Sequence, residues 1–114
     1  MARYTYVVHT NPSEGQEQEY NRWYDEVHIP EVLQVPGFVS ASRLAIAQPD
    51  AEAPYRYLAL YEMETNDLEA TMAELMSRAG TPAMPISDSM NAEAVRTIVA
   101  DQLGARVLAP LTTA

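Results

Sequence analysis

The side chains best suited to chemistry in this sequence gather around His28. Tyr24 precedes His28 by four residues, so on a helix the two side chains would lie on one face. An imidazole has an ordinary pKa of about 6.5 and can therefore move a proton near neutral pH. Pro30 has no backbone N–H and interrupts a regular helix beside His28, and such helix ends commonly border a cavity. We interpret His28 as a general acid or base; the alternative is that it caps the helix or bonds a backbone carbonyl.

Other candidates lie close to it in the sequence. Tyr24 could orient the histidine or donate to a substrate oxygen, and Trp23 could form an apolar wall, although aromatic residues at helical spacing are more often core residues. Arg43 lies among small alanines in an expected strand, where a buried guanidinium needs an anionic or carbonyl partner. We favour a structural carboxylate such as Asp25 or Glu62; the alternative is a substrate oxygen that Arg43 would stabilise.

Further ligand contacts are expected from two strands and one loop. His9, in the first expected strand, is more typical of a hydrogen-bonded sheet residue than of a ligand contact. Tyr61 is expected on the uncovered side of the sheet, where it could line a pocket but more readily packs across a dimer. The segment 81–91 shows neither helical nor strand periodicity, and a stretch of that size is often a functional loop. Its Met84 and Ile86 favour an apolar ligand and a lid.

Composition excludes several kinds of protein. The 114 residues favour one domain, spanning 1–114, and the net charge of -9 disfavours binding to nucleic acid. No cysteine is present and all seven basic residues are arginine, so thiolate chemistry, cysteine-based metal sites and lysine Schiff bases are excluded. With two histidines, one chain cannot form a three-histidine zinc site, although two subunits could share one, and we assign no metal residue. Without an apolar run long enough for a membrane span, we expect a cytoplasmic protein that binds no membrane.

The hydrophobic pattern predicts the elements that position these residues. A helix is expected over 14–28, with a capping box formed by Ser13 and Gln16, and Pro30 either kinks or restarts it. A second helix begins after Asn66 or Asp67 and ends at Gly80. Strands are expected over 3–10, 38–47, 55–63 and 93–100.

This order of elements is the ferredoxin-like βαββαβ arrangement, an α+β fold in which a four-stranded antiparallel sheet carries both helices on one face. In the third strand, Leu58 and Leu60 should point one way, and Tyr57, Ala59 and Tyr61 the other, so both faces are largely nonpolar. In the second strand, Phe38 should share a face with Leu44 and Ile46. Two helices cover one face only, so we expect a homodimer in which two sheets meet. An apolar tail helps to seal the contact; it carries Leu103, Val107, Leu108 and Leu111.

The sequence also resembles the dimeric α+β barrel superfamily, of the EthD-like and stress-responsive barrel types. The resemblance lies in the run from Trp23 to Leu33, in Pro36-Gly37-Phe38, in Ser42-Arg43-Leu44 and in the strand from Tyr57 to Glu62. It implies a homodimer with a small organic molecule between the sheet and its loops. The reactions of the superfamily include oxygenation without a cofactor, lactone isomerisation, dehydration and haem breakdown, so the fold alone does not decide the reaction. The cysteine of some isomerase members is absent, and no haem-ligand signature is visible.

Together, these observations predict an enzyme that uses no cofactor and acts on a small, partly apolar, cyclic or aromatic metabolite. His28 would be the general acid or base, and Tyr24 and Arg43 would polarise or anchor an oxygen. Isomerase, lyase and oxygenase reactions all begin with removal of a proton beside an oxygen-bearing carbon, so the sequence does not rank them. The alternative is a homodimer that binds a hydrophobic small molecule without catalysis.

Overall fold

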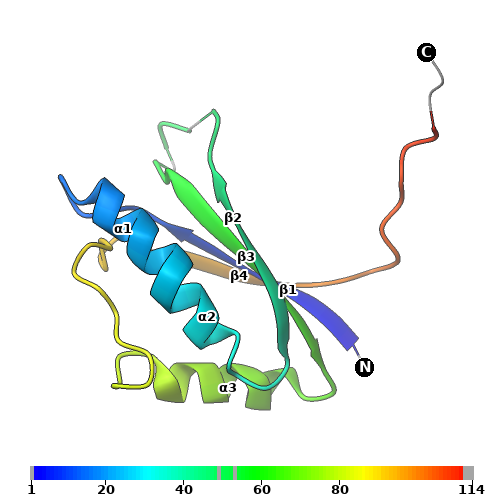
Figure 1. Cartoon of the computed structure of the whole chain (residues 1–114). Helices are drawn as coiled ribbons and strands as arrows, with labels where there is room; N and C mark the ends of the chain where they lie inside the picture. Colours follow the sequence, from blue (N-terminus) through cyan, green and yellow to red (C-terminus); the bar gives the residue numbers. More distant parts are fainter. Residues whose placement is uncertain (1, 49, 53, 112–114) are drawn as a thin grey trace.

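The computed structural model describes residues 2–48, 50–52 and 54–111. Its elements are β1 (Ala2–Thr10), α1 (Glu17–Trp23), the π-helical segment η1 (Tyr24–His28), α2 (Ile29–Val32), β2 (Phe38–Ala45), β3 (Tyr57–Thr65), α3 (Leu68–Arg78) and β4 (Arg96–Asp101). The four strands form one antiparallel sheet in the order β2-β3-β1-β4, with the helices on one side of it (Figure 1). The ferredoxin-like α+β fold is confirmed. Along the described residues, no helix is both long and apolar enough to cross a membrane.

The ends of the strands differ from those expected because pairing with β1 sets them. β3 pairs with β1 from Tyr57 opposite Thr10 to Thr65 opposite Ala2, so it begins and ends two residues later than the hydrophobic run suggests. β4 begins at Arg96, which lies opposite His9, and not at residue 93. Backbone pairing with a long central strand therefore overrides local composition at the ends.

A β-bulge changes which residues of β2 face the helices. Phe38 lies opposite Met63 and Ser40 lies opposite Glu62, so β2 has one extra residue between these pairs. The sequence pattern alone predicts an unbroken alternation, which would place Phe38 on the same face as Leu44. Because of the bulge, this prediction is wrong. Phe38 is buried beneath the helices, whereas Leu44 is exposed on the opposite face.

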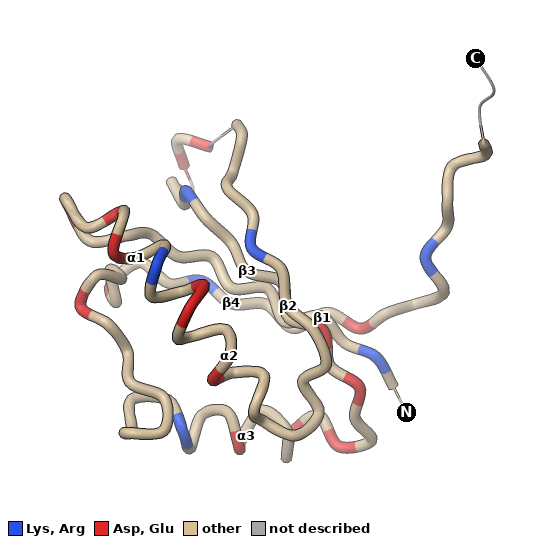
Figure 2. Tube along the Cα trace, viewed as in Figure 1, with Lys and Arg blue, Asp and Glu red and all other residues tan. Residues whose placement is uncertain are grey.

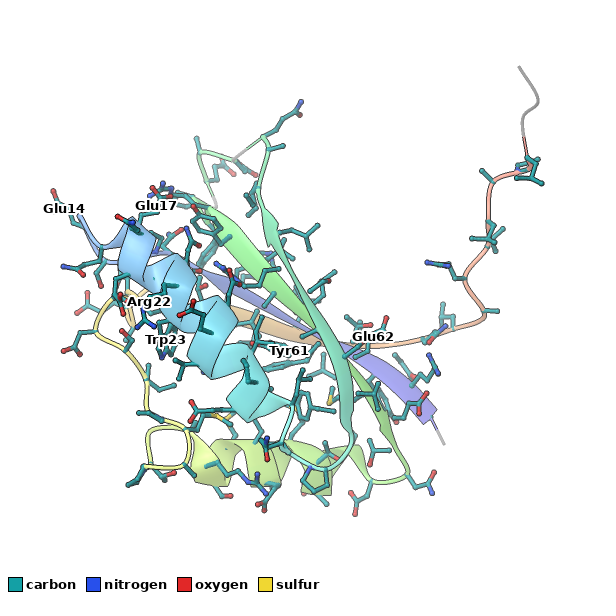
Figure 3. The ribbon with its side chains drawn as sticks, in the orientation of Figure 1. Glu14, Glu17, Arg22, Trp23, Tyr61 and Glu62 are labelled. Atoms are coloured by element: carbon teal, nitrogen blue, oxygen red, sulfur yellow. The ribbon has the colours of Figure 1, made fainter. Side chains whose placement is uncertain are left out.

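The tyrosine side of β3 also lies opposite to its expected position. Leu58 and Leu60 do alternate with Tyr57, Ala59 and Tyr61, but it is the tyrosine side that the helices cover. Tyr61 is 1% exposed and lies between the helices and the sheet (Figure 3). The expectation that Tyr61 faces the uncovered side is therefore wrong. When both faces of a strand are apolar, alternation identifies two faces without showing which one is covered.

The first helix is continuous through Pro30 and does not restart there. In η1, the N–H of Ile29 donates to the carbonyl of Tyr24, five residues back, which is the wider turn of a π-helix. The proline ring crowds the carbonyl four residues before it and offers no N–H, and a widened turn relieves both problems. The chain then continues in α2, where Leu33 N–H donates to the carbonyl of Ile29 at 3.0 Å.

The expected capping box does not form. The helix begins at Glu17 without a capping bond from a side chain. Ser13 instead contacts the loop that follows α3. Its N–H donates to the carbonyl of Ser89 and its hydroxyl donates to the carbonyl of Asp88, both at 2.7 Å. The segment 11–13 therefore anchors a distant loop and does not start the helix.

The face of the sheet away from the helices is uncovered within the described residues, and apolar side chains lie together in its middle. It is called the open face below. Its side chains include Val7, Leu44, Leu58, Leu60 and Ile98, of which Leu44 and Ile98 are exposed and the others half-buried. Such a continuous apolar surface is typical of a contact between proteins.

The turn before β2 supplies a test of the fold. Gly37 has a φ of +100°, and a Cβ there would lie 3.0 Å from Cγ2 of Thr71 in α3. Gly15, at φ +76°, has open space around it. We expect Gly37→Ala to lower the free energy of unfolding by about 2–4 kcal/mol, from backbone strain plus overpacking, and Gly15→Ala by about 1 kcal/mol from strain alone. Urea unfolding at one protein concentration measures both. Equal losses would show that α3 does not pack on this turn.

Candidate functional site

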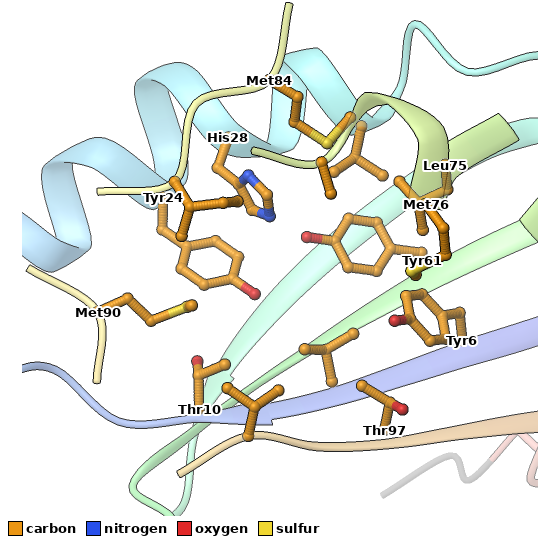
Figure 4. Close-up of a pocket in the computed structure, with 15 residues that line it drawn as sticks. Tyr6, Thr10, Tyr24, His28, Tyr61, Leu75, Met76, Met84, Met90 and Thr97 are labelled. Carbon is orange, nitrogen blue, oxygen red and sulfur yellow. The ribbon is translucent and has the colours of Figure 1, made fainter. Parts of the chain in front are cut away.

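A cavity of about 200 Å³ lies between the covered face of the sheet, the first helix, α3 and the loop after α3 (Figure 4). Its lining is mostly aliphatic and methionine side chains, from Val8, Val32, Leu75, Met76, Ala79, Met84, Ile86, Met90 and Val95. Its polar lining side chains are Tyr6, Thr10, Tyr24, His28, Tyr61 and Thr97. No carboxylate, lysine or arginine lines this cavity. It is therefore suited to an uncharged molecule that is largely apolar.

Tyr24 and His28 lie on the same wall of the cavity, as their spacing of four residues predicts. Both belong to η1, and their rings meet edge to face with centroids 5.1 Å apart. Trp23 lies behind them, stacked on the imidazole at 4.7 Å. The Nδ1 atom of His28 is buried and has no hydrogen-bond partner in the part of the chain that is described. A buried polar nitrogen without a hydrogen-bond partner is uncommon in a folded protein.

Burial decides the charge of His28. Its removal from water lowers the pKa of His28 to about 4, since no nearby carboxylate offsets the cost of burying a cation. The imidazole is therefore neutral at physiological pH, with one nitrogen able to accept a proton. A role as a cationic helix cap, the alternative drawn from the sequence, requires a charge that this environment disfavours.

Two tyrosine hydroxyls complete the polar wall. The hydroxyl of Tyr61 is buried without a hydrogen-bond partner among the described residues. Burial, and then the neighbouring Tyr24, raise the pKa of Tyr61 well above its ordinary value. Burial likewise raises the pKa of Tyr24 to about 12. Both phenols keep their protons at neutral pH and are donors, and Figure 4 shows their hydroxyls directed into the cavity that His28 borders.

Arg43 lies behind this wall and does not line the cavity. Its guanidinium donates to Asp25 at 3.0 Å and to Asn21 at 2.9 Å, which confirms Asp25 as its carboxylate partner in preference to Glu62. The guanidinium carbon lies 4.5 Å from the centre of the Tyr24 ring, and the side chain is 12% exposed. The cation therefore packs against the ring whose hydroxyl enters the cavity.

The remaining candidates divide between the cavity and the open face. Met84 and Ile86 line the cavity, and Met84 is fully buried. His9 lies on the other side of the sheet, with its ring 5.5 Å from that of Tyr55, because β1 directs its even-numbered side chains to the cavity. The structure thus brings His28, Tyr24, Tyr61, Met84 and Ile86 to one site and leaves His9 outside it.

Strand residues that the sequence interpretation did not select also line the site. Tyr6, Val8 and Thr10 alternate along β1 and face the cavity, and Thr97 of β4 lies opposite Val8. Period-two alternation in β1 would have identified the first three as one face. The loop that carries Met84, Ile86 and Met90 is tied to the segment 11–13, where Asn91 N–H donates to the carbonyl of Asn11 at 2.9 Å. These bonds hold one wall of the cavity in place.

Within the described residues, no group of three or more histidine, aspartate or glutamate side chains is arranged to hold a metal ion.

The fold is shared with solved structures of low sequence identity. An EthD family protein from Bacillus halodurans C-125 is 12% identical, with 90% of this chain and 100% of that chain covered and a TM-score of 0.51. A "putative monooxygenase" from Shewanella loihica PV-4 is 15% identical over 96% and 99% of the two chains, with a TM-score of 0.55. A dimeric ferredoxin-like protein from Jannaschia sp. CCS1 is 14% identical over 85% and 96%, with a TM-score of 0.52. This chain thus shares its ferredoxin-like fold with an EthD family protein and with a dimeric ferredoxin-like protein, which is the fold that the sequence resemblance implies.

Sequence comparison identifies the family more directly. No curated protein matches the chain. One family model matches residues 3–79, a range that holds β1, the first helix, β2, β3, α3, and with them Tyr24, His28 and Tyr61. Because this match covers most of the chain, the protein belongs to the family described as Domain of unknown function (DUF4286).

Proposed function

We propose that this protein is an enzyme that uses no cofactor and acts on a small, partly apolar, uncharged cyclic or aromatic metabolite, with His28 as the general acid or base. The observation that carries the proposal is a neutral imidazole at the wall of an apolar cavity into which two tyrosine hydroxyls also point. A base and an oxygen-binding donor within one water-poor pocket are the minimum needed to remove a proton beside a carbonyl or a hydroxyl-bearing carbon.

The size and polarity of the cavity support this class of substrate. A buried apolar cavity of about 150 Å³ is enough to bind benzene. A cavity of about 200 Å³ therefore fits a ring with a few substituents. Because no charged side chain lines it, a carboxylate or phosphate would be buried there without a counter-ion, which favours neutral ligands.

The proposed step uses the groups already on the wall. His28 takes a proton from the carbon next to a ligand carbonyl; the C–H bond breaks, its electron pair forms a C=C bond, and the π pair of the carbonyl moves onto the oxygen. The hydroxyl of Tyr61 or Tyr24 donates to the oxygen as it becomes negative. Return of the proton to another carbon gives isomerisation, loss of a leaving group gives elimination, and reaction with O₂ gives oxygenation.

Arg43 is proposed to support the step through Tyr24. Its guanidinium is fixed by Asp25 and Asn21 and lies against the Tyr24 ring, so it holds the phenol toward the cavity. Its positive charge also favours the partial negative charge that a donor phenol acquires.

We also propose that the working unit is a homodimer joined through the open face. Leu44 and Ile98 are exposed there beside the half-buried Leu58 and Leu60, and the two helices cover only the other face. The ferredoxin-like protein from Jannaschia sp. CCS1, which shares this fold, is described as dimeric. A second copy of the chain presents the same apolar face, and in a two-fold dimer the same patch of each subunit forms the contact.

The competing function, binding of a hydrophobic small molecule without catalysis, is favoured by the same apolar lining. It requires the cavity and the dimer but no proton transfer. The two functions therefore differ in what His28 does once a ligand is bound.

The first test is proton exchange on a neutral cyclic ketone, 2-tetralone, followed by NMR in D₂O. We expect the protein to accelerate exchange of the hydrogens beside the carbonyl, and His28→Gln to reduce the acceleration by about 10²-fold or more. His9→Gln, on the open face, is the matched control and should leave the rate unchanged. If His28→Gln binds the ketone and exchanges its hydrogens as fast as the wild type does, His28 is not the base and the binding function is supported.

The second test is the pH dependence of stability. The pKa of His28 is about 4 in the folded protein, whereas the unfolded chain takes up this proton near the ordinary value of about 6.5. The stability linked to a neutral His28 is thus complete above that ordinary value and is lost as the pH falls toward 4. Between pH 7 and 5 the wild type should lose about 2 kcal/mol more than His28→Gln, as measured by urea unfolding. Identical losses in the two proteins would contradict the burial of a neutral imidazole.

A further inference from the structure

The chain that follows β4 is an apolar segment without contacts to cover it. Residues 102–111, called the arm below, leave the sheet and extend away from the helices and strands (Figure 1). Leu103 is 100% exposed, Val107 91%, Leu108 71% and Leu111 99%. Large apolar side chains in water are unfavourable, and four of them within one short segment are typical of a segment that binds a protein surface.

We infer that the arm of each subunit packs on the open face of a second copy, with Arg106 beside Glu62 of that copy. The inference rests on the homodimer of the proposed function and adds the segment that the two subunits exchange. It joins two apolar surfaces that are uncovered within the described residues, the arm and the open face.

Charge favours this occupant. Arg106 is the only charged residue of the arm, and the whole chain has a net charge of -9, so the arm is cationic and the rest of the protein strongly acidic. Figure 2 shows acidic residues distributed over the helices and the sheet. On the open face, Glu64 is paired with Arg3, whereas Glu62 forms no ion pair within the described residues and bonds only the hydroxyl of Ser40, at 3.3 Å. Glu62 is therefore an acid available to a cation from another chain.

The arm also begins at the end of the sheet where Glu62 lies. A shallow hollow there is lined by Val39, Glu62 and Gln102, among other residues. Gln102 N–H donates to the carbonyl of Arg3 at 3.0 Å, and its side-chain amide donates to the carbonyl of Gly104 at 2.7 Å, at a bend where the arm turns outward. Val39, in the bulge of β2, is exposed beside Glu62. In a symmetric dimer, an arm that packs in this hollow on the other copy is exchanged reciprocally.

The absence of cysteine from the sequence allows a clean cross-linking test. A Val107→Cys variant is mixed with a Val39→Cys variant that carries a fusion tag, so that the two chains differ in size on a gel. A short bismaleimide is then added. We expect a mixed cross-linked species on a denaturing gel. Ala73→Cys, exposed on α3 and therefore on the covered side of the sheet, replaces Val39→Cys as the control and should give none. Equal cross-linking with both partners overturns the inference. A double variant that cross-links only within its own chain also overturns it.

Sedimentation experiments then test the arm inference and the proposed dimer separately. Truncation after Gln102 should weaken self-association by about 10²-fold, because it removes four apolar contacts from each arm. Arg106→Glu should weaken it by about 3- to 10-fold, and adding Glu62→Arg should restore it. If the truncated chain associates as tightly as the wild type, the arm inference fails and the dimer stands. If the wild-type chain sediments as a monomer at every concentration, the arm inference and the proposed dimer both fail.

Discussion

The widened helical turn at Tyr24–His28 is the constraint on which the site depends. Pro30 cannot continue a regular α-helix, and the π-helical turn that accommodates it adds a residue before the chain resumes in α2. Tyr24 and His28 share a helix face through their spacing of four residues, and the extra residue sets the register between them and Val32 of α2, which lines the same cavity. Trp23 is stacked behind the imidazole. Without the wider turn, a helix of this length would present a different set of side chains to the sheet.

A neutral imidazole follows from that placement. The environment supplies apolar side chains, two phenols and no carboxylate, so the half-buried imidazole of His28 has no charge partner. The nearby cation, Arg43, is held outside the cavity by Asp25 and Asn21. The site is thus a base and two donors in a water-poor space, a combination that suits removal of a proton from a neutral molecule better than recognition of an anion.

Much of the fold could be predicted from the sequence because the strands and helices follow simple periodicities. The order of the elements, and the position of Tyr24 and His28 on one helix face, can be predicted from spacing. Two features could not be predicted in this way. The bulge after Phe38 shifts the alternation of β2 by one residue, and no local signal marks it. Tyr61 lies on a strand that is apolar on both faces, so only the packing of the helices shows that it faces the cavity.

The protonation state of His28 is the most direct test of this account. The measurement is an NMR titration of the two imidazole rings, with the His28 resonance assigned by its loss in a His28→Gln sample. We expect His28 to titrate near pH 4, and its resonances to shift when a neutral cyclic ketone is added. A midpoint near the ordinary value of about 6.5, with resonances unaffected by such ligands, would show a solvated histidine and contradict the account.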